Sequence, residues 1–185
     1  MFDLEGFVND NSIRVVSSQQ VKQAVSDVRR DIYDSHRHRV FALAFYMTGN
    51  ELEAEDILTR TFIEAFRGAA EPQAGQLDTA LVAELRQRFA LDASEPPATL
   101  KSTSCANQDL GGRNVRRTDL EEAIQTLPAT ERLLFLLRDV EGYSPAAISQ
   151  LLNMPESKVQ RVLFSARIRL RQALAVAQTR QQQAA

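Results

Sequence analysis

The side chains best suited to binding chemistry lie near the C-terminal end of the chain. Polar and basic residues recur there at helical spacing, and the candidate contact residues are Ser157, Lys158, Gln160, Arg161, Ser165 and Arg167. Lysine and arginine neutralise phosphates, while arginine and glutamine also form paired hydrogen bonds with guanine and adenine edges. These residue types therefore indicate contact with duplex DNA. A helical hairpin with a solvated basic face is the alternative that these residues alone leave open.

Two sharply marked turns position this segment. Ser144-Pro145 predicts the start of a short helix, because serine caps helices and proline is favoured at the first helical position. Asn153-Met154-Pro155 then breaks the chain before a longer helix. The apolar stripe of that helix is Val159, Val162, Leu163, Ala166, Leu170, Ala173 and Leu174, with Phe164 and Ile168 expected to face away from the core. A short helix, a tight turn and a longer helix that is basic near its start form the layout of a helix-turn-helix.

A second charged group lies in the first half of the chain, where Gly49 predicts the end of one helix and Asn50 the cap of the next. The carboxylates that follow are Glu51, Glu53, Glu55 and Asp56. Glu53 stands three residues after Asn50, as in a capping box. The carboxylates could form a contact surface for a protein partner, or they could only complement the helix dipole. Both interpretations remain open on these residues.

Composition excludes several classes of function. The single cysteine, Cys105, rules out an intramolecular disulfide framework, and two histidines cannot build a metal centre with the ligand spacings present. We therefore expect no metal, no cofactor and no enzymatic activity. No stretch approaches the ~18 apolar residues that cross a membrane, and no signal peptide is evident, so we expect a cytoplasmic protein.

Charge is unevenly distributed along the chain. Residues 1–100 carry 10 basic and 16 acidic side chains, whereas from residue 145 onward the counts are 6 and 1. A basic C-terminal end on an otherwise acidic protein is typical of a chain that contacts a polyanion through that end and a different partner through its acidic half.

Periodicity predicts an all-α protein with two small helical domains and a flexible linker. Helices are expected over about residues 20–33, 35–48, 50–67 and 77–91, with Gly68 ending the third. The segment 93–117 is rich in proline, glycine, serine and threonine, which is typical of a linker. Thr118 and Glu121 form a second expected capping box. The predicted units are an N-terminal extension (1–19), a helical domain (20–92), the linker (93–117), a helix-turn-helix domain (118–177) and a disordered tail (178–185).

Two motifs resemble the extracytoplasmic-function (ECF) sigma factors of bacteria. The stretch LPATERLLFLLRDVEGYS and the helix-turn-helix after it are similar to family region 4, and AEDILTRTF stands where region 2 has AED-x-x-Q-x-x-F. The resemblance implies a DNA-binding transcription factor that recruits core RNA polymerase to promoters. Region 2 would dock on the polymerase clamp and region 4 would bind the minus-35 element. The docking residues that it implies are Glu55, Asp56, Arg60 and Phe62. Phe62 also lies on the apolar stripe of the helix that follows Asn50, and this position predicts a buried side chain. An anti-sigma factor is a further implied partner.

The chain departs from the family pattern at three places. Thr59 and Arg60 replace the glutamine of region 2 and a common acidic residue, and Ser165 stands where the recognition helix usually has arginine. The stretch 75–94, where the family has a tryptophan-containing helix that captures single-stranded DNA, contains no tryptophan and one aromatic residue, Phe89. We expect promoter melting to be poorly supported. The alternative function is a sigma-like regulator that binds polymerase, an anti-sigma factor or DNA without opening promoters; an unrelated helix-turn-helix repressor is disfavoured, because it would not need a region 2.

Overall fold

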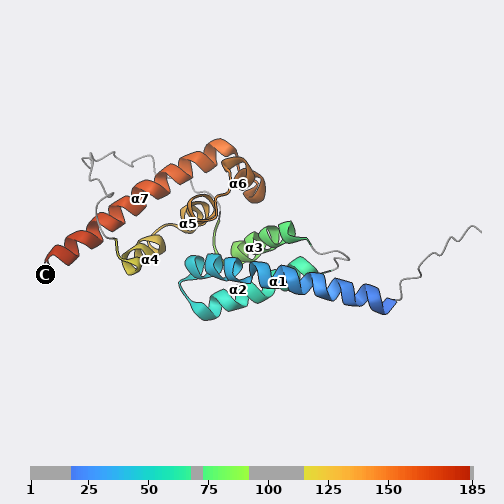
Figure 1. Cartoon of the computed structure of the whole chain (residues 1–185). Helices are drawn as coiled ribbons and strands as arrows, with labels where there is room; N and C mark the ends of the chain where they lie inside the picture. Colours follow the sequence, from blue (N-terminus) through green and yellow to red (C-terminus); the bar gives the residue numbers. More distant parts are fainter. Residues whose placement is uncertain (1–17, 68–72, 92–114, 184–185) are drawn as a thin grey trace, which may run out of the picture.

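The computed structural model describes residues 18–67, 73–91 and 115–183, and all regular structure within these ranges is helical (Figure 1). The elements are α1 (Ser18–Thr48), α2 (Glu51–Phe66), α3 (Ala74–Arg88), α4 (Arg117–Gln125), α5 (Ala129–Phe135), the π-helical turn η2 (Leu136–Val140), α6 (Pro145–Leu152) and α7 (Glu156–Gln183). This confirms the all-α fold class. Most of the predicted linker, Gly68 and residues 184–185 of the predicted tail lie outside the described residues, and the division into two domains stays a prediction.

The first helix is longer than the sequence indicates. We expected one helix over about 20–33 and another from Ser35, but α1 is continuous from Ser18 to Thr48. No glycine or proline interrupts this stretch, and Arg30 pairs with Asp34 at 3.9 Å across the expected junction. An (i, i+4) ion pair of this kind supports a continuous helix.

The turn between α1 and α2 confirms the expected helix stop and the Asn50 cap, but not the full capping box, because the backbone N–H of Asn50 donates to Thr48 Oγ1 and not to the Glu53 side chain. Gly49 adopts φ +71°, which favours glycine, and the side chain of Asn50 accepts hydrogen bonds from the backbone N–H groups of Leu52 and Glu53. A Cβ on Gly49 would also lie 3.2 Å from the side chain of Gln125 in α4. The glycine is therefore needed for the turn, and its missing side chain leaves room for the end of the Gln125 side chain.

The helix-turn-helix is also confirmed. Ser144 Oγ accepts from Ala147 N at 3.1 Å with Pro145 in the first turn of α6, and Asn153 ends that helix in the left-handed region at φ 51°. The expected cap at Thr118 is wrong, because α4 begins at Arg117, one residue earlier. The exposed pair Arg117–Glu121, at 2.7 Å, lies along that first turn.

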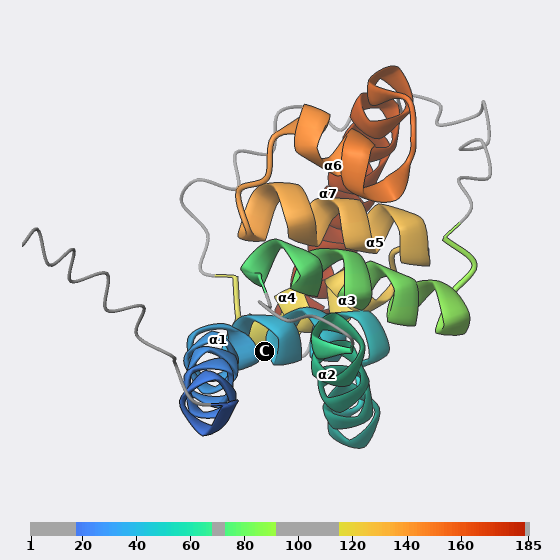
Figure 2. The ribbon, with the colours of Figure 1, turned by 90° about the vertical axis from the view of Figure 1, so that its right-hand side faces the viewer.

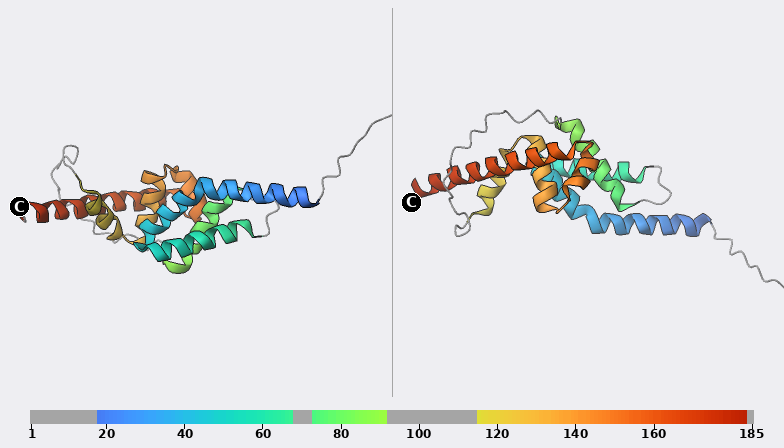
Figure 3. Two further views of the ribbon diagram at one scale, coloured as in Figure 1. Left: turned by 60° about the horizontal axis from the view of Figure 1, so that its bottom comes forward. Right: turned by 90° about the horizontal axis from the view of Figure 1, so that it is seen from above.

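The core runs through both halves of the chain. Leu43, Leu85, Leu134 and Ile148 belong to one buried apolar cluster that contains residues of α1, α2, α3, α5, α6 and α7. Figure 2 shows α3 between α1 and α2 on one side and α5 and α6 on the other. A smaller cluster joins α4 to α7 through Ile124, Leu170 and Leu174, among others. Figure 3 shows that α1 and α7 extend past this bundle at opposite ends.

One apolar residue near the end of α5 and η2 is not in the core. Leu133, Leu136 and Leu137 are buried, but Val140, which follows them at helical spacing, is 56% exposed. The π-helical turn from Leu136 to Val140 changes the helical phase, so a residue at regular α-helical spacing no longer points inward.

Candidate nucleic-acid interface and docking face

The first turns of α7 present polar and basic side chains to solvent. Ser157, Gln160 and Arg161 are exposed and Lys158 is half-buried, while Val159 in the same turns is fully buried. Phe164, one turn after Gln160, is 67% exposed. The structure therefore brings four of the six predicted DNA-contact residues together on one outward surface, which we call the α7 face: Ser157, Lys158, Gln160, Arg161 and the neighbouring Phe164.

Ser165 does not belong to the α7 face. It is 1% exposed, and its hydroxyl donates to Glu131 Oε1 in α5 at 2.9 Å. The expectation that Ser165 contacts DNA is therefore contradicted, because α5 covers a wider strip of α7 than the apolar stripe alone predicts. Ile168, also expected to face outward, is half-buried.

Arg167 lies on the surface but is already paired within the chain. Its Nη2 and Nε atoms lie 2.6 and 3.0 Å from the two carboxylate oxygens of Asp139. This two-point contact raises the pKa of Arg167, with the hydrogen bond as the main cause. It also orients the guanidinium toward η2. A contact with DNA therefore requires Arg167 either to break its hydrogen bonds to Asp139 or to bind DNA and Asp139 at the same time.

The outward surface of α2 has a different chemistry. Exposed residues at positions 52, 56, 59 and 63 follow helical spacing along one side of the helix. Leu52 is 77% exposed and Ile63 is 56% exposed, and the carboxylate of Asp56 lies between them in the sequence. We call this surface the α2 face: Leu52, Glu55, Asp56, Thr59 and Ile63. The sequence does contain a signal for Leu52 and Ile63, since both are apolar residues that lie outside the buried stripe of α2.

The carboxylate of Asp56 joins the α2 face to α3. It accepts from Arg60 Nε at 3.0 Å within α2 and from Arg88 Nη2 at the end of α3. These two hydrogen bonds, first that from Arg88 and then that from Arg60, lower the pKa of Asp56. The carboxylate is exposed, ionised and oriented by two arginines, one bonded to each of its oxygens.

Phe62 is a core residue and not a contact residue. It is 5% exposed, with its ring centroid 4.8 Å from that of Tyr33 in α1 and 5.6 Å from that of Phe66. The apolar-stripe interpretation of Phe62 is confirmed, and its assignment as a surface docking residue is wrong. The other three predicted docking residues, Glu55, Asp56 and Arg60, are exposed on α2.

The end of α3 offers little for binding single-stranded DNA. Arg88 pairs with Asp56, and Arg86 Nη2 donates to the backbone carbonyl of Leu152 at 2.6 Å. Phe89 is the C-cap of α3 and is half-buried. Both arginines of this helix thus have partners inside the chain.

The described residues hold no cluster of three or more histidine, cysteine or carboxylate side chains that could bind a metal ion. Over the same residues, every helix is too short or too polar to cross a bilayer.

Comparison with known proteins agrees with this geometry. Residues 117–170 match the family described as sigma-70, region 4. The chain is 28% identical over 156 residues to the ECF RNA polymerase sigma factor SigE of Mycolicibacterium smegmatis, covering 78% of this chain and 61% of that protein. It is 25% identical over 175 residues to the ECF RNA polymerase sigma factor SigW of Bacillus subtilis, covering 84% of this chain and 94% of that protein.

A solved structure shares the fold. The sigma factor RpoE from Bartonella quintana, in complex with the anti-sigma factor NepR, aligns with a TM-score of 0.51 at 18% identity, over 85% of this chain and 98% of RpoE. At this identity the structural likeness shows the fold alone. The similarity to sigma factors rests on the sequence matches. Residues 117–170 therefore match the sigma-70, region 4 family, and over most of its length the chain is similar in sequence to ECF RNA polymerase sigma factors.

Proposed function

We propose that the chain is an ECF-type sigma factor that recruits core RNA polymerase to promoters in DNA-templated transcription initiation. In this proposal the α7 face binds the minus-35 element and the α2 face docks on the clamp of the largest polymerase subunit. The observation that carries the proposal is the α7 face itself: outward polar and basic residues on the second helix of a helix-turn-helix, within the segment that matches region 4. The chain supplies contacts and positioning, so it is not an enzyme, and its place of action is the cytoplasm, where the polymerase works.

The geometry of α7 suits the major groove. In a helix-turn-helix the first turns of the second helix contact base edges, and the first helix crosses the phosphate backbone. Gln160 and Arg161 are exposed in those turns and have the donors that read adenine and guanine. Lys158, half-buried beside them, has its ammonium group in reach of a flanking phosphate and carries no base preference there.

The α2 face suits a basic and partly apolar protein surface. Asp56 supplies a carboxylate that stays ionised, and Leu52 and Ile63 supply apolar area on either side of it along the helix. Apolar side chains around a charge exclude water and strengthen a charge-assisted hydrogen bond to a partner. Docking then requires the partner to share Asp56 with Arg60 and Arg88 or to replace one of them.

A second candidate function is a sigma-like regulator that binds polymerase, an anti-sigma factor or DNA without opening promoters. The features of α3 favour it. Strand capture relies on aromatic stacking and free cationic groups, whereas Phe89 is half-buried and Arg86 and Arg88 are engaged within the chain. The whole sequence contains no tryptophan.

Run-off transcription with core polymerase across a promoter library tests the proposal and separates the two candidates. Specific transcripts that depend on the chain support the initiating sigma factor. Stable copurification with core polymerase without transcripts supports the regulator, and absence of both contradicts the initiating sigma factor. Permanganate footprinting then measures opening directly: reactive thymines over the start site exclude the regulator, and an unreactive start site at a bound promoter favours it.

A further inference from the structure

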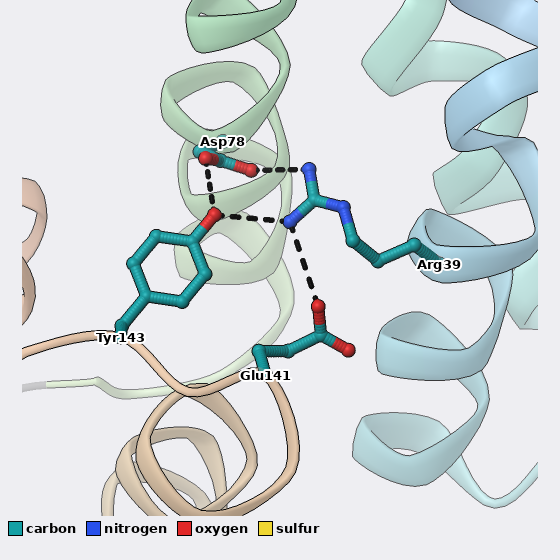
Figure 4. A network of polar contacts seen from close by, with 4 residues as sticks. All are labelled: Arg39, Asp78, Glu141 and Tyr143. Carbon is teal, nitrogen blue, oxygen red and sulfur yellow. Dashed lines mark hydrogen bonds and ion pairs between the residues drawn. The ribbon is translucent and has the colours of Figure 1, made fainter.

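A polar cluster joins the two halves of the molecule. Arg39 of α1 and Asp78 of α3 meet Glu141 and Tyr143, which lie on the segment between η2 and α6 (Figure 4). Arg39 Nη2 lies 2.6 Å from Asp78 Oδ1, and Arg39 Nη1 lies 3.0 Å from the Tyr143 hydroxyl oxygen and 3.8 Å from Glu141 Oε2. The Tyr143 hydroxyl in turn donates to the other oxygen of Asp78. Three of the four side chains thus form a closed ring of hydrogen bonds.

This cluster is shielded from water, which strengthens it. The side chains of Arg39, Asp78 and Glu141 are 23%, 21% and 17% exposed. Burial by itself would lower the pKa of Arg39, but the hydrogen bond and charge of Asp78 outweigh it and the pKa is raised. Burial, more than any neighbour, raises the pKa of Glu141. Arg39 and Asp78 are therefore the strongly coupled ion pair, and the more distant Glu141 is a weaker member.

The cluster borders the surface through which α3 meets α6. Near the other end of α3, Arg86 donates to the carbonyl of Leu152, the last residue of α6. A second set of bonds lies at the end of α1, where Arg132 Nη1 donates to the carbonyl of Met47 at 2.6 Å. Polar contacts thus accompany the shared apolar core along the boundary between the halves.

The boundary combines this shared apolar core with polar contacts. Opening it exposes apolar side chains, but the charged and hydroxyl groups regain hydrogen bonds from water, so the polar contacts are the part of the boundary that is exchanged most easily. Directional bonds also select one arrangement, because each donor must meet its acceptor.

We propose that the Arg39–Asp78–Tyr143–Glu141 cluster is a latch that holds the halves in one closed arrangement, in which α3 is covered by α6, and that breaking it releases them. The closed arrangement leaves both the α2 face and the α7 face exposed but fixes the distance between them. The consequence for transcription, that release lets the two faces reach polymerase and the upstream promoter element together, rests on the proposed function. The latch itself does not.

Electron-electron double resonance on the free full-length chain tests the latch without polymerase or DNA. Spin labels are attached to Lys22→Cys on α1 and Gln172→Cys on α7, two exposed positions, in a Cys105→Ser background. The otherwise unaltered chain should give one narrow distance. Asp78→Asn should increase the ratio of longer distances to the closed distance about tenfold, because it removes the charge that pairs with Arg39 and leaves one acceptor oxygen for the two donors, Arg39 and Tyr143.

Two further variants keep this test decisive. Tyr143→Phe removes only the hydroxyl and should shift the ratio a few-fold in the same direction, so it serves if Asp78→Asn loses helicity by circular dichroism. Asp34→Asn breaks the exposed Arg30–Asp34 pair inside α1 and is the matched control, which should leave the distance unchanged. A broad distribution in the unaltered chain, or the same narrow distance in Asp78→Asn, Tyr143→Phe and Asp34→Asn, would overturn the latch.

Discussion

The α2 face and the α7 face are both outward surfaces of amphipathic helices, yet they differ in chemistry. The α2 face places the carboxylate of Asp56 along the helix between exposed Leu52 and Ile63. The α7 face places Lys158, Gln160 and Arg161 around a helix start. An ionised carboxylate among apolar groups suits a basic protein surface, whereas a cationic and amide-bearing helix start suits duplex DNA. The difference in chemistry is the reason that the proposed function gives each face a different macromolecule.

The faces also differ in how they are tied to the interior. On α2 the central carboxylate is itself bonded within the chain, because Asp56 accepts hydrogen bonds from Arg60 and Arg88. On α7 the residues that are bonded within the chain lie about one turn beyond the α7 face, where Ser165 bonds to Glu131 and Arg167 bonds to Asp139. Substitutions on α2 should therefore change both docking and local ion pairing, while binding and stability should be separable on α7.

The largest effect is expected from Asp56→Arg. It places a cation against a surface that the proposal requires to be basic, and like charges at an interface cost several kcal/mol, so binding to core polymerase should fall on the order of 100-fold. Copurification and a binding titration measure this. Asp27→Arg on α1 is the control for the charge change alone. A loss of thermal stability in Asp56→Arg with unchanged polymerase affinity would show that Asp56 is only a structural pair.

Glu131→Ala should have the largest effect on stability. It removes the carboxylate that accepts from the Ser165 hydroxyl and pairs with Arg169, whose Nε lies 3.2 Å from Glu131 Oε2. Leaving the buried Ser165 hydroxyl and a partly buried arginine without this partner should lower the free energy of unfolding by about 2–3 kcal/mol in urea denaturation. Ser165→Ala should cost about 1 kcal/mol and leave DNA affinity unchanged. If the Ser165→Ala variant is stable but loses DNA binding, Ser165 contacts DNA and its assignment as a buried structural residue is wrong.

Arg161→Ala separates base reading from general attraction on the α7 face. If Arg161 contacts a base edge, the variant should lose about 1–3 kcal/mol of binding free energy on the preferred site and much less on other duplexes. Fluorescence anisotropy with matched and substituted duplexes provides the comparison. Equal losses on every duplex would assign Arg161 to a phosphate instead.

Lys158→Ala should give a smaller and uniform change. Losing one phosphate contact weakens all duplexes alike and reduces the slope of log affinity against log salt by about 1. The measurement is the same titration at several salt concentrations. Sequence-dependent losses, or an unchanged slope, would contradict the phosphate role.

The smallest change should come from moderate acid. The folded-state pKa of Asp56 is lowered by Arg88 and Arg60, so its ionised form persists below the unfolded-state value and is lost only as pH falls through the folded-state pKa. Polymerase binding should therefore keep the same dependence on Asp56, judged against Asp56→Asn, from pH 8 down to about pH 5. A dependence on Asp56 that disappears within this range would contradict the proposed ionisation state.

Local turn chemistry was predictable from the sequence because the causes lie within a few residues. Ser144-Pro145, Asn153 and Gly49-Asn50 each determine a cap or a left-handed turn, and all are observed. The buried stripe of α7 was predictable for the same reason. Family resemblance added the order of the two motifs, which the comparisons support.

Features that depend on distant partners were not predictable in this way. The burial of Ser165 depends on Glu131, and the state of Asp56 depends on Arg88, residues that lie 34 and 32 positions away. Nothing in the local pattern of α1 indicated that Arg39 meets Tyr143 across 104 positions. Helical periodicity identifies the side that faces the core but not how wide a strip the neighbouring helices cover.

Photo-crosslinking in the ternary complex tests most directly whether the two faces have different partners. The full chain carries p-benzoylphenylalanine at Leu52 in one sample and at Gln160 in another, and is mixed with core polymerase and promoter DNA. We expect Leu52→p-benzoylphenylalanine to crosslink to the largest polymerase subunit, and Gln160→p-benzoylphenylalanine to crosslink to DNA upstream of the start site. Crosslinking of both positions to the same molecule, or a reversed pattern, would contradict the account.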